Sequence, residues 1–459
     1  MKRAFHAPMN GALSRPAAAR WLIYSGVVYT ITAIAYFVVP VWRRFSEVLL
    51  GTTPFRHDSV LNAGILEWDF RALLDPQLSV FDWTAGFPLS NTLAGTEHLL
   101  GWLFFYGPLR ASGLSVAGSY NVVLILSFLI SAIGTAILAR WLGVSRIGAF
   151  LAGFVFAFYP LHIDHAIHLQ TMSVCWSPFA LLGLEMTLSE KSVRGPALLG
   201  TSFIATALCG MYFAVFLTLV LALYVIVAWW IGRYPFRWET VGRIAVAGVV
   251  SLVLLSPVLL HYFQYASAHG AYKHPAEMLI KFSFPPVGLL RTPNWLWVWQ
   301  HTRIATEAIE TGGFPGLIAV SLVLLALITR QADRGARRIR IQLLIPAVVA
   351  FLLALGPVLT LHSSIAYEPL RWLPMPGRIW LLFTAIRWPT RMILYTGLFG
   401  SVLAGIGFDR LAMFSPGRWR AISTVVFLLA WLELRPATWY STESLALGNP
   451  MDISDAYPF

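Results

Sequence analysis

Residues 120–139 read YNVVLILSFLISAIGTAILA, and this stretch decides the fold class because it contains no charged side chain. An α-helix of this length crosses a hydrocarbon core of about 30 Å, at a rise of about 1.5 Å per residue. Similar uncharged runs occur at residues 21–41 and 341–361. Because a membrane-spanning segment must satisfy its own backbone hydrogen bonds, these runs predict an all-α integral membrane protein.

The composition of the whole chain agrees with this prediction. Of its 459 residues 58% are hydrophobic and 12% are charged, and the mean hydropathy is +0.69. Soluble domains carry about 25% charged residues, so a large soluble protein with buried helices is the poorer interpretation. The two cysteines, Cys175 and Cys209, lie in apolar runs and indicate no disulfide framework. The first apolar run lacks a small-residue cleavage site, so we expect an uncleaved span and not a signal peptide.

About eleven segments are expected to cross the membrane as a polytopic helical bundle. Residues 196–231 are too long for one crossing, and we divide them at Gly210, with Pro196 suited to the first turn of its helix. The expected spans lie near residues 21–41, 119–139, 147–160, 171–189, 196–209, 212–231, 244–263, 312–329, 341–360, 390–408 and 420–434. They form one transmembrane module over residues 1–435, with a first outer loop at about 42–118 and a short extracytoplasmic tail at 436–459.

The basic residues indicate the orientation of the bundle. The net charge is +12, and most of the 33 lysines and arginines fall in the short connections on one side of the expected spans. The positive-inside rule assigns that side to the cytoplasm, so the N-terminus is cytoplasmic and the C-terminus extracytoplasmic. No zinc-ligand spacing or nucleic-acid motif accompanies the positive charge, and nucleic acid is not an expected partner.

The first outer loop carries most of the acids that could take part in chemistry. Asp58 follows soon after the first span, and Glu67 and Asp69 lie further along the loop. A loop acid is most simply explained as part of a solvated surface. The position of Asp58 favours a functional role more strongly than that of the other two.

Glu97 and His98 directly precede the apolar run 99–109, which is too short to cross the membrane. With Trp102 and Tyr106, this run predicts a helix lying in the membrane interface. An acid placed at its start lies just outside the bilayer, where it can meet a lipid head group.

A dense polar cluster, YPLHIDHAIHLQ at residues 159–170, separates the third and fourth expected spans. His162 and His165 share one face of a helical turn, as do His165 and His168, and Gln170 follows them. Imidazoles in this arrangement can bind a metal with a carboxylate from elsewhere, contact a head group or substrate, or only supply interfacial polarity. All three interpretations remain open on the residues alone.

Arginines also occur on the outer side, where the positive-inside rule does not favour them. Arg387 and Arg391 flank Trp388-Pro389-Thr390, after an apolar run at 379–386 that predicts a second interfacial helix in this late outer loop. A guanidinium is the preferred bidentate partner of a phosphate. The alternative is unspecific snorkelling toward lipid phosphates.

This layout resembles the GT-C superfamily of membrane glycosyltransferases, including the bacterial YfhO-like multi-pass proteins. The resemblance extends from the first span to about Arg410, and its local features are residues 97–101 (EHLLG), 165–170 (HAIHLQ) and 387–391 (RWPTR). It implies transfer of a sugar from a polyprenyl-phosphate-linked donor to an acceptor on the extracytoplasmic face of a bacterial inner (plasma) membrane. The acid of the first outer loop, here Asp58, is then the catalytic base.

The resemblance implies an inverting enzyme that works with a lipid-linked donor and membrane lipid as its partners. The residues expected to bind substrate are Glu67, Asp69, Glu97, His98, His162, His165, His168, Gln170, Arg387 and Arg391. The chain departs from some relatives in lacking an Asp-x-Asp pair. No metal ligand is therefore assigned, although a divalent metal is admitted as a cofactor. A transporter or lipid flippase and a non-catalytic membrane scaffold are the alternative functions, and the oligomeric state stays open.

The orientation can be tested with a reporter fused after Phe459. Because the basic residues gather on the opposite side, we expect a phosphatase fusion at this end to be active outside the cytoplasm. A biotin-acceptor tag at the same end should stay unmodified by the cytoplasmic ligase. A biotinylated C-terminus would contradict the assignment.

Overall fold

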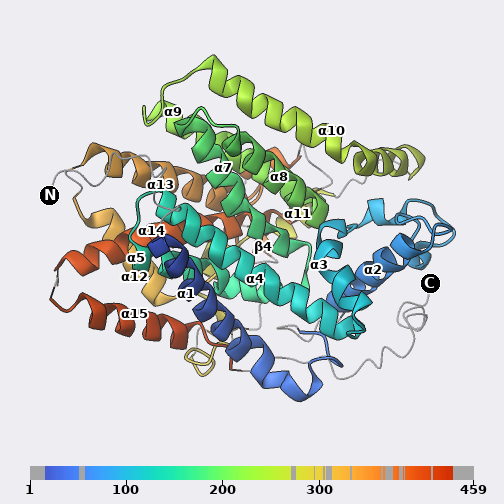
Figure 1. The fold of residues 1–459 in the computed structure, drawn as a ribbon, viewed down its shortest axis with the longest axis horizontal. Coiled ribbons are helices and arrows are strands. Elements are labelled where there is room, and N and C mark those ends of the chain that lie inside the picture. Colours follow the sequence, from blue (N-terminus) through green and yellow to red (C-terminus); the bar gives the residue numbers. More distant parts are fainter. Residues whose placement is uncertain are drawn as a thin grey trace.

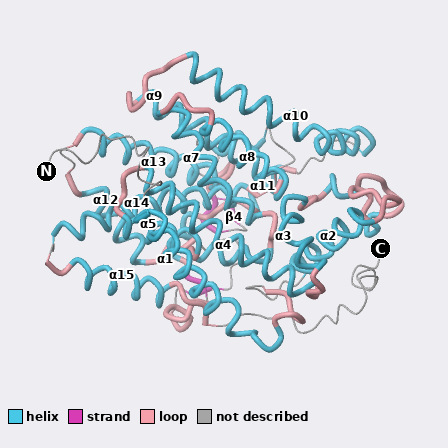
Figure 2. The backbone as a smooth tube through the Cα atoms, viewed as in Figure 1, coloured by secondary structure: helices cyan, strands magenta, loops and turns pink. Residues whose placement is uncertain are grey.

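The computed structural model describes residues 16–50, 57–269, 275–293, 295–302, 305–306, 313–330, 333–362, 365–366, 376–381, 386, 388–414 and 417–437. Helices account for most of this part of the chain, with connecting loops and a few very short strands (Figures 1 and 2). The long helices lie roughly alongside one another as a bundle, and α2 and α3 form a group at one end of it (Figure 1).

The elements follow one another in a simple order. The α-helices are α1 (Pro16–Ala33), α2 (His57–Leu74), α3 (Leu100–Ala111), α4 (Val116–Trp141), α5 (Arg146–Ala157), α6 (Pro160–Asp164), α7 (Ser177–Ser189), α8 (Arg194–Cys209), α9 (Met211–Trp230), α10 (Trp238–His269), α11 (Ala276–Lys281), α12 (Leu317–Ile328), α13 (Arg334–Ala354), α14 (Ile393–Phe414) and α15 (Trp419–Glu433). The strands are β1 (Thr292–Pro293), β2 (Ala305–Thr306), β3 (Thr360–His362) and β4 (Ile365–Ala366), paired β1 with β2 and β3 with β4.

Each expected span coincides with a helical segment, and the division at Gly210 is confirmed by the break between α8 and α9. Six segments of the described chain are long and apolar enough to cross a membrane: Ala19–Arg44, Val116–Trp141, Arg146–Ile167, Met211–Trp230, Trp238–His269 and Pro389–Leu411. The helix Leu317–Ile328 is apolar but shorter. The all-α membrane architecture is thus confirmed, while the number of eleven crossings stays a prediction.

The first outer loop is more ordered than the sequence suggested. Part of it folds into α2 and α3, and α2 was not expected at all. The predicted helix at 99–109 is present as α3, but Trp102 and Tyr106 are fully buried in the protein. Their rings therefore pack inside the molecule and do not face a membrane interface, contrary to the expectation.

The late outer loop is described only in part. A short 3-10 helix, Pro376–Leu381, covers the beginning of the interfacial helix expected at 379–386, and residues 382–385 lie outside the described residues. The expected tail at 436–459 likewise lies outside them, except for residues 436–437.

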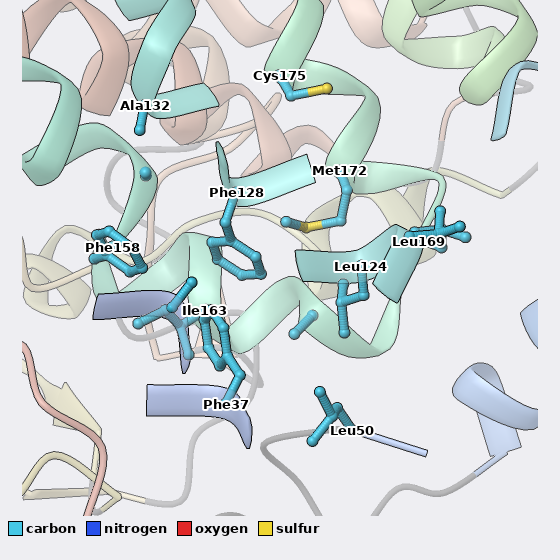
Figure 3. Packing of buried hydrophobic residues seen from close by; sticks show 14 of the residues in the cluster. Phe37, Leu50, Leu124, Phe128, Ala132, Phe158, Ile163, Leu169, Met172 and Cys175 are labelled. Atoms are coloured by element: carbon cyan, nitrogen blue, oxygen red, sulfur yellow. The ribbon is translucent and has the colours of Figure 1, made fainter. Parts of the chain in front are cut away.

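The core of the bundle contains an aromatic cluster close to the polar segment 159–170. Phe128 of α4 packs 4.6 Å from Phe37 and 6.2 Å from Phe158, measured between ring centroids. Figure 3 shows Ile163 and Met172 beside these rings. In a water-soluble protein, burial of a side chain of this size stabilises the folded state by about 1.5–3 kcal/mol. In a membrane protein, close packing of the side chains supplies this stabilisation instead.

Small residues let the helices approach closely, as at the contact between α7 and α8. A Cβ built on Gly183 of α7 would lie 2.4 Å from the backbone nitrogen of Leu199 in α8. A real Cβ cannot occupy that distance, so any larger residue must push the two helices apart. A Cβ built on Gly248 of α10 would instead have no atom within 4 Å.

Replacing Gly183 by alanine should therefore destabilise the protein. Overpacking of this kind costs about 1–3 kcal/mol, whereas Gly248→Ala should be neutral or slightly stabilising because alanine favours helix. Thermal unfolding of the detergent-solubilised protein measures both variants. Equal midpoints for the two would contradict the close contact between α7 and α8 at Gly183.

Candidate functional site

A turn rich in histidine lies between α5 and α7. Pro160 occupies the first turn of α6, where its missing N–H costs nothing, and a 3-10 turn His165–Ile167 follows directly. The chain leaves regular helix here, so its carbonyls need other partners. Asn62 of α2 donates to the Ile167 carbonyl at 3.2 Å, and Trp102 of α3 donates to that of Leu169 at 3.2 Å. The first outer loop thus holds the turn in place.

Asp58, near the beginning of α2, meets this turn. Its Oδ2 lies 2.8 Å from Nε2 of His168. The Asp58 side chain is 44% exposed and that of His168 is 7% exposed. The pair therefore lies where the buried interior opens to the surface, and the imidazole orients the carboxylate.

Arg391 reaches the same region from the late part of the chain. It belongs to the 3-10 helix Pro389–Met392 and is buried. Its guanidinium contacts the hydroxyl of Tyr212, and its carbon lies 5.4 Å from the Tyr212 ring centroid and 5.0 Å from that of Trp388. The Tyr212 hydroxyl is also 3.3 Å from Oγ1 of Thr171, just after the histidine turn.

His165 connects the two groups. Its ring centroid is 5.6 Å from that of His168, and Arg391 is close enough for its charge to act on His165. Asp58, His168, His165 and Arg391 are therefore successive neighbours, and their roles stay predictions. Arg387 lies outside the described residues.

Glu97, which precedes α3 in the sequence, lies beside the first turn of α9 in space. Its Oε2 accepts a hydrogen bond from the backbone N–H of Met211 at 2.9 Å, and the N–H of Tyr212 bonds to the same carboxylate. Burial raises the pKa of Glu97 to about 7, although these hydrogen bonds and the charge of Arg391 act in the opposite direction. Leu99, two residues on, has φ 48°, a left-handed conformation that leucine rarely adopts. This turn separates Glu97 from α3.

Other predicted residues serve different contacts. His162 is fully buried between Phe128 and Phe156, with ring centroids 5.2 and 5.3 Å away, and its Nδ1 is 3.1 Å from the Phe156 carbonyl oxygen. His98 is bonded through Nδ1 to the hydroxyl of Tyr262 of α10 at 3.0 Å, and burial lowers its pKa to about 4. Neither histidine contacts the Asp58–His168 pair in the described contacts.

Glu67 and Asp69 were also expected to bind substrate, but they do not share a site with Asp58. Nine residues along α2 turn Glu67 to the opposite face of the helix, about 13 Å away along its axis. Its carboxylate is bonded by Arg110 at 2.8 Å and by the Tyr106 hydroxyl at 2.9 Å. Both acids are buried, so the simple view of loop acids as a solvated surface is wrong for them.

The two acids are in opposite electrostatic environments. Burial opposes the ionisation of Glu67, but the bonds from Arg110 and Tyr106 outweigh it and lower the pKa of Glu67 below its usual value. Burial alone raises the pKa of Asp69 well above its usual value, and neither carboxyl oxygen has a hydrogen-bond partner among the described residues. The surroundings therefore favour the ionised form of Glu67 and the protonated form of Asp69.

Gln170 lies close to the beginning of α9. The backbone carbonyl oxygen of Gln170 would be 2.4 Å from a Cβ built on Gly210. Only glycine at position 210 therefore permits the two segments to approach this closely. Tyr212 and Thr171, which contact Arg391 or each other, were not singled out from the sequence. The glycine that divides residues 196–231 was the available signal, since Tyr212 follows it by two positions.

Metal binding remains a prediction. Within the described ranges, no group of three or more His, Cys, Asp or Glu side chains is placed to hold a metal ion. Since residues 51–56 and parts of the late loops are outside those ranges, a ligand set completed from them stays untested.

The geometry can be compared with known proteins. No family model and no curated protein matches the sequence. The solved structure of the arabinofuranosyltransferase AftD from Mycobacteria matches with a TM-score of 0.55 at 15% identity, over 92% of this chain and 27% of AftD. A mutant form of AftD matches with a TM-score of 0.52 at 18% identity, over 91% of this chain and 28% of that one. ArnT from Cupriavidus metallidurans gives a TM-score of 0.47 at 16% identity, over 90% of this chain and 65% of ArnT.

The chain shares its fold with the arabinofuranosyltransferase AftD. This confirms the fold to which its sequence layout pointed, and with the apolar helices it identifies a multi-pass membrane protein. At these identities the likeness concerns the fold, and the chain spans about a quarter of the length of AftD. In this fold, Asp58 lies in the first turn of α2, the α-helix that follows α1.

The contrast between Glu67 and Asp69 predicts two different responses to amide substitution. Glu67→Gln removes a charge that Arg110 requires, so it should cost about 2 kcal/mol at neutral pH. Asp69→Asn replaces a neutral acid by a neutral amide of the same shape and should be tolerated. Thermal unfolding measures both, and a larger loss for Asp69→Asn would contradict the assignment.

The pH dependence of the same variants gives a second test. A raised pKa means that the folded chain holds a proton at Asp69 which the unfolded chain releases above about pH 4, so this residue lowers stability as the pH rises. The Asn variant lacks this effect. Its unfolding midpoint, relative to wild type, should rise between about pH 5 and about pH 8. A pH-independent difference would show that Asp69 ionises in the folded state.

Proposed function

We propose that this protein transfers a sugar from a polyprenyl-phosphate-linked donor to an acceptor hydroxyl. The observation that carries the proposal is the convergence of a partly exposed carboxylate, Asp58, with a buried guanidinium, Arg391, through His165 and His168. The first is suited to an acceptor, the second to a phosphate. The GT-C fold, shared with a structure named as an arabinofuranosyltransferase, supports the same class of reaction.

The acceptor half of the reaction falls to Asp58. The acceptor oxygen forms a bond to the anomeric carbon while its proton passes to the Asp58 carboxylate. His168, 2.8 Å from Oδ2, orients that carboxylate toward the open side. A positioned base of this kind contributes about 10²–10⁴-fold to the rate.

The leaving half of the reaction falls to Arg391. The bond between the anomeric carbon and the phosphate oxygen breaks, and its electron pair leaves with the lipid phosphate. Because the leaving group is already an anion, the site needs positive charge and not a strong acid. A single displacement with one carboxylate inverts the anomeric configuration, whereas a two-step mechanism needs a nucleophile beside the base.

The outer face of a bacterial inner (plasma) membrane is the proposed location of the reaction. The basic residues of the short connections support an orientation in which the loop carrying Asp58 is extracytoplasmic. The donor, dissolved in the membrane, and a water-accessible acceptor then meet at the same depth.

Asp58→Asn tests the proposal. Removal of the base should lower the rate of sugar transfer at least about 10²-fold while leaving expression and membrane insertion intact. The assay follows radiolabelled sugar from the lipid-linked donor pool into acceptor in membranes carrying the protein.

Asp75→Asn is the matched control. Asp75 lies in the same loop and is exposed, and its side chain accepts a bond from the backbone N–H of Gln77 at 2.9 Å. Its variant should retain wild-type transfer. Full activity of the Asp58 variant would reject Asp58 as the base, and uptake of a labelled solute by proteoliposomes without any transfer would indicate a transporter.

A further inference from the structure

The contacts of Glu97 suggest a role that differs from substrate binding. Glu97 is half-buried, and its carboxylate is engaged by the backbone N–H groups of Met211 and Tyr212, at the first turn of α9. The N-terminal N–H groups of a helix have no partner within the helix, and a carboxylate there both satisfies them and compensates the positive end of the helix dipole. Glu97 therefore fixes the first turn of α9 to the first outer loop.

Tyr212 projects from that turn toward Arg391. Its hydroxyl contacts the guanidinium and lies 3.3 Å from Oγ1 of Thr171, and its ring lies 5.4 Å from the guanidinium carbon. Trp388 provides a second ring, at 5.0 Å. Two aromatic faces and a hydroxyl thus limit the directions in which the Arg391 side chain can point.

Gly210 makes this arrangement possible. It separates α8 from α9, and a Cβ at this position would lie 2.4 Å from the Gln170 carbonyl oxygen and 2.9 Å from Oγ of Ser173. The close approach brings the first turn of α9 against the segment that follows the histidine turn. Tyr212 can therefore contact Thr171 and Arg391 together.

We infer that Glu97 and Tyr212 are positioning residues, which hold Arg391 in the orientation that binds a lipid phosphate. Glu97 acts on the backbone of α9, and Tyr212 transmits that placement to the guanidinium. The inference rests on the proposed function, in which Arg391 binds the phosphate of the donor. It assigns a role to Tyr212, for which the sequence alone offered none.

The physical reason lies in the cost of ordering a long cation inside the protein. An arginine side chain loses much of its rotamer entropy when it is fixed. If Tyr212 and Trp388 have already fixed it, phosphate binding does not bear this cost. Because Tyr212 is neutral, its hydroxyl positions Arg391 without neutralising the positive charge that a phosphate requires.

A double-mutant cycle on phosphate binding tests the inference. The full chain in nanodiscs is titrated with a polyprenyl phosphate that carries no sugar, and affinity is measured for wild type, Tyr212→Phe, Arg391→Lys and the double variant. We expect Tyr212→Phe to weaken binding about 5–10-fold. In the Arg391→Lys background the same change should have almost no effect, because the flexible ammonium gains nothing from the tyrosine.

Tyr395→Phe is the matched control. Tyr395 of α14 is buried and its hydroxyl accepts a bond from Ser177 at 3.4 Å, so this variant should bind polyprenyl phosphate as wild type does. Glu97→Gln, which keeps an acceptor for the α9 N–H groups, should bind more tightly than Glu97→Ala. Thr171→Val gives a milder change at the same hydroxyl, about 2–3-fold, for use if Tyr212→Phe does not fold.

The outcomes separate the inference from the proposed function. Additive effects of Tyr212→Phe and Arg391→Lys, or no binding of polyprenyl phosphate by wild type, would overturn the inference. Coupled effects on binding together with absent sugar transfer in wild type would support the inference and reject the transferase. Sugar transfer that is normal in wild type and unaffected by Tyr212→Phe would support the transferase and reject the inference.

Discussion

The need to hydrogen-bond every backbone group within a membrane protein is the constraint on which the candidate site depends. Between α5 and α7 the chain abandons regular helix, and its carbonyls cannot turn to water as they would in a soluble protein. Asn62 and Trp102 supply the missing donors at Ile167 and Leu169. Both come from the first outer loop, so the irregular turn and that loop require each other. The acid of α2 is brought to the histidines by the same contacts.

This mutual dependence explains what the sequence revealed about the fold and what it concealed. Long uncharged runs such as residues 120–139 predicted their helices closely, because nothing but a spanning helix suits them. The helix α2 escaped prediction because polar residues interrupt its apolar ones and because it lies between two expected spans. Its stability comes from contacts with α3 and the histidine turn, which are distant in sequence.

The candidate site was predictable in its outline and not in its detail. Asp58, His168 and Arg391 were each recognisable as polar residues at the edge of an apolar run, on the same expected side of the membrane. The position of His162 was not, since the periodicity that placed it with His165 holds only in a continuous helix. Tyr212 was hidden for another reason: it stands in a uniformly apolar span, where an aromatic residue is ordinary.

The unequal exposure of Asp58 and Arg391 has a consequence for how two substrates would meet. The carboxylate, 44% exposed, faces the water, whereas the guanidinium is buried among tyrosine, tryptophan and histidine. On the proposed reaction, a hydrophilic acceptor and a hydrophobic donor would approach along separate routes, one from the aqueous phase and one through the bilayer. The aqueous route would exclude the hydrophobic donor, and the bilayer route would exclude the hydrophilic acceptor. The protein would then select its two reactants by their solubility before it recognises either of them by shape.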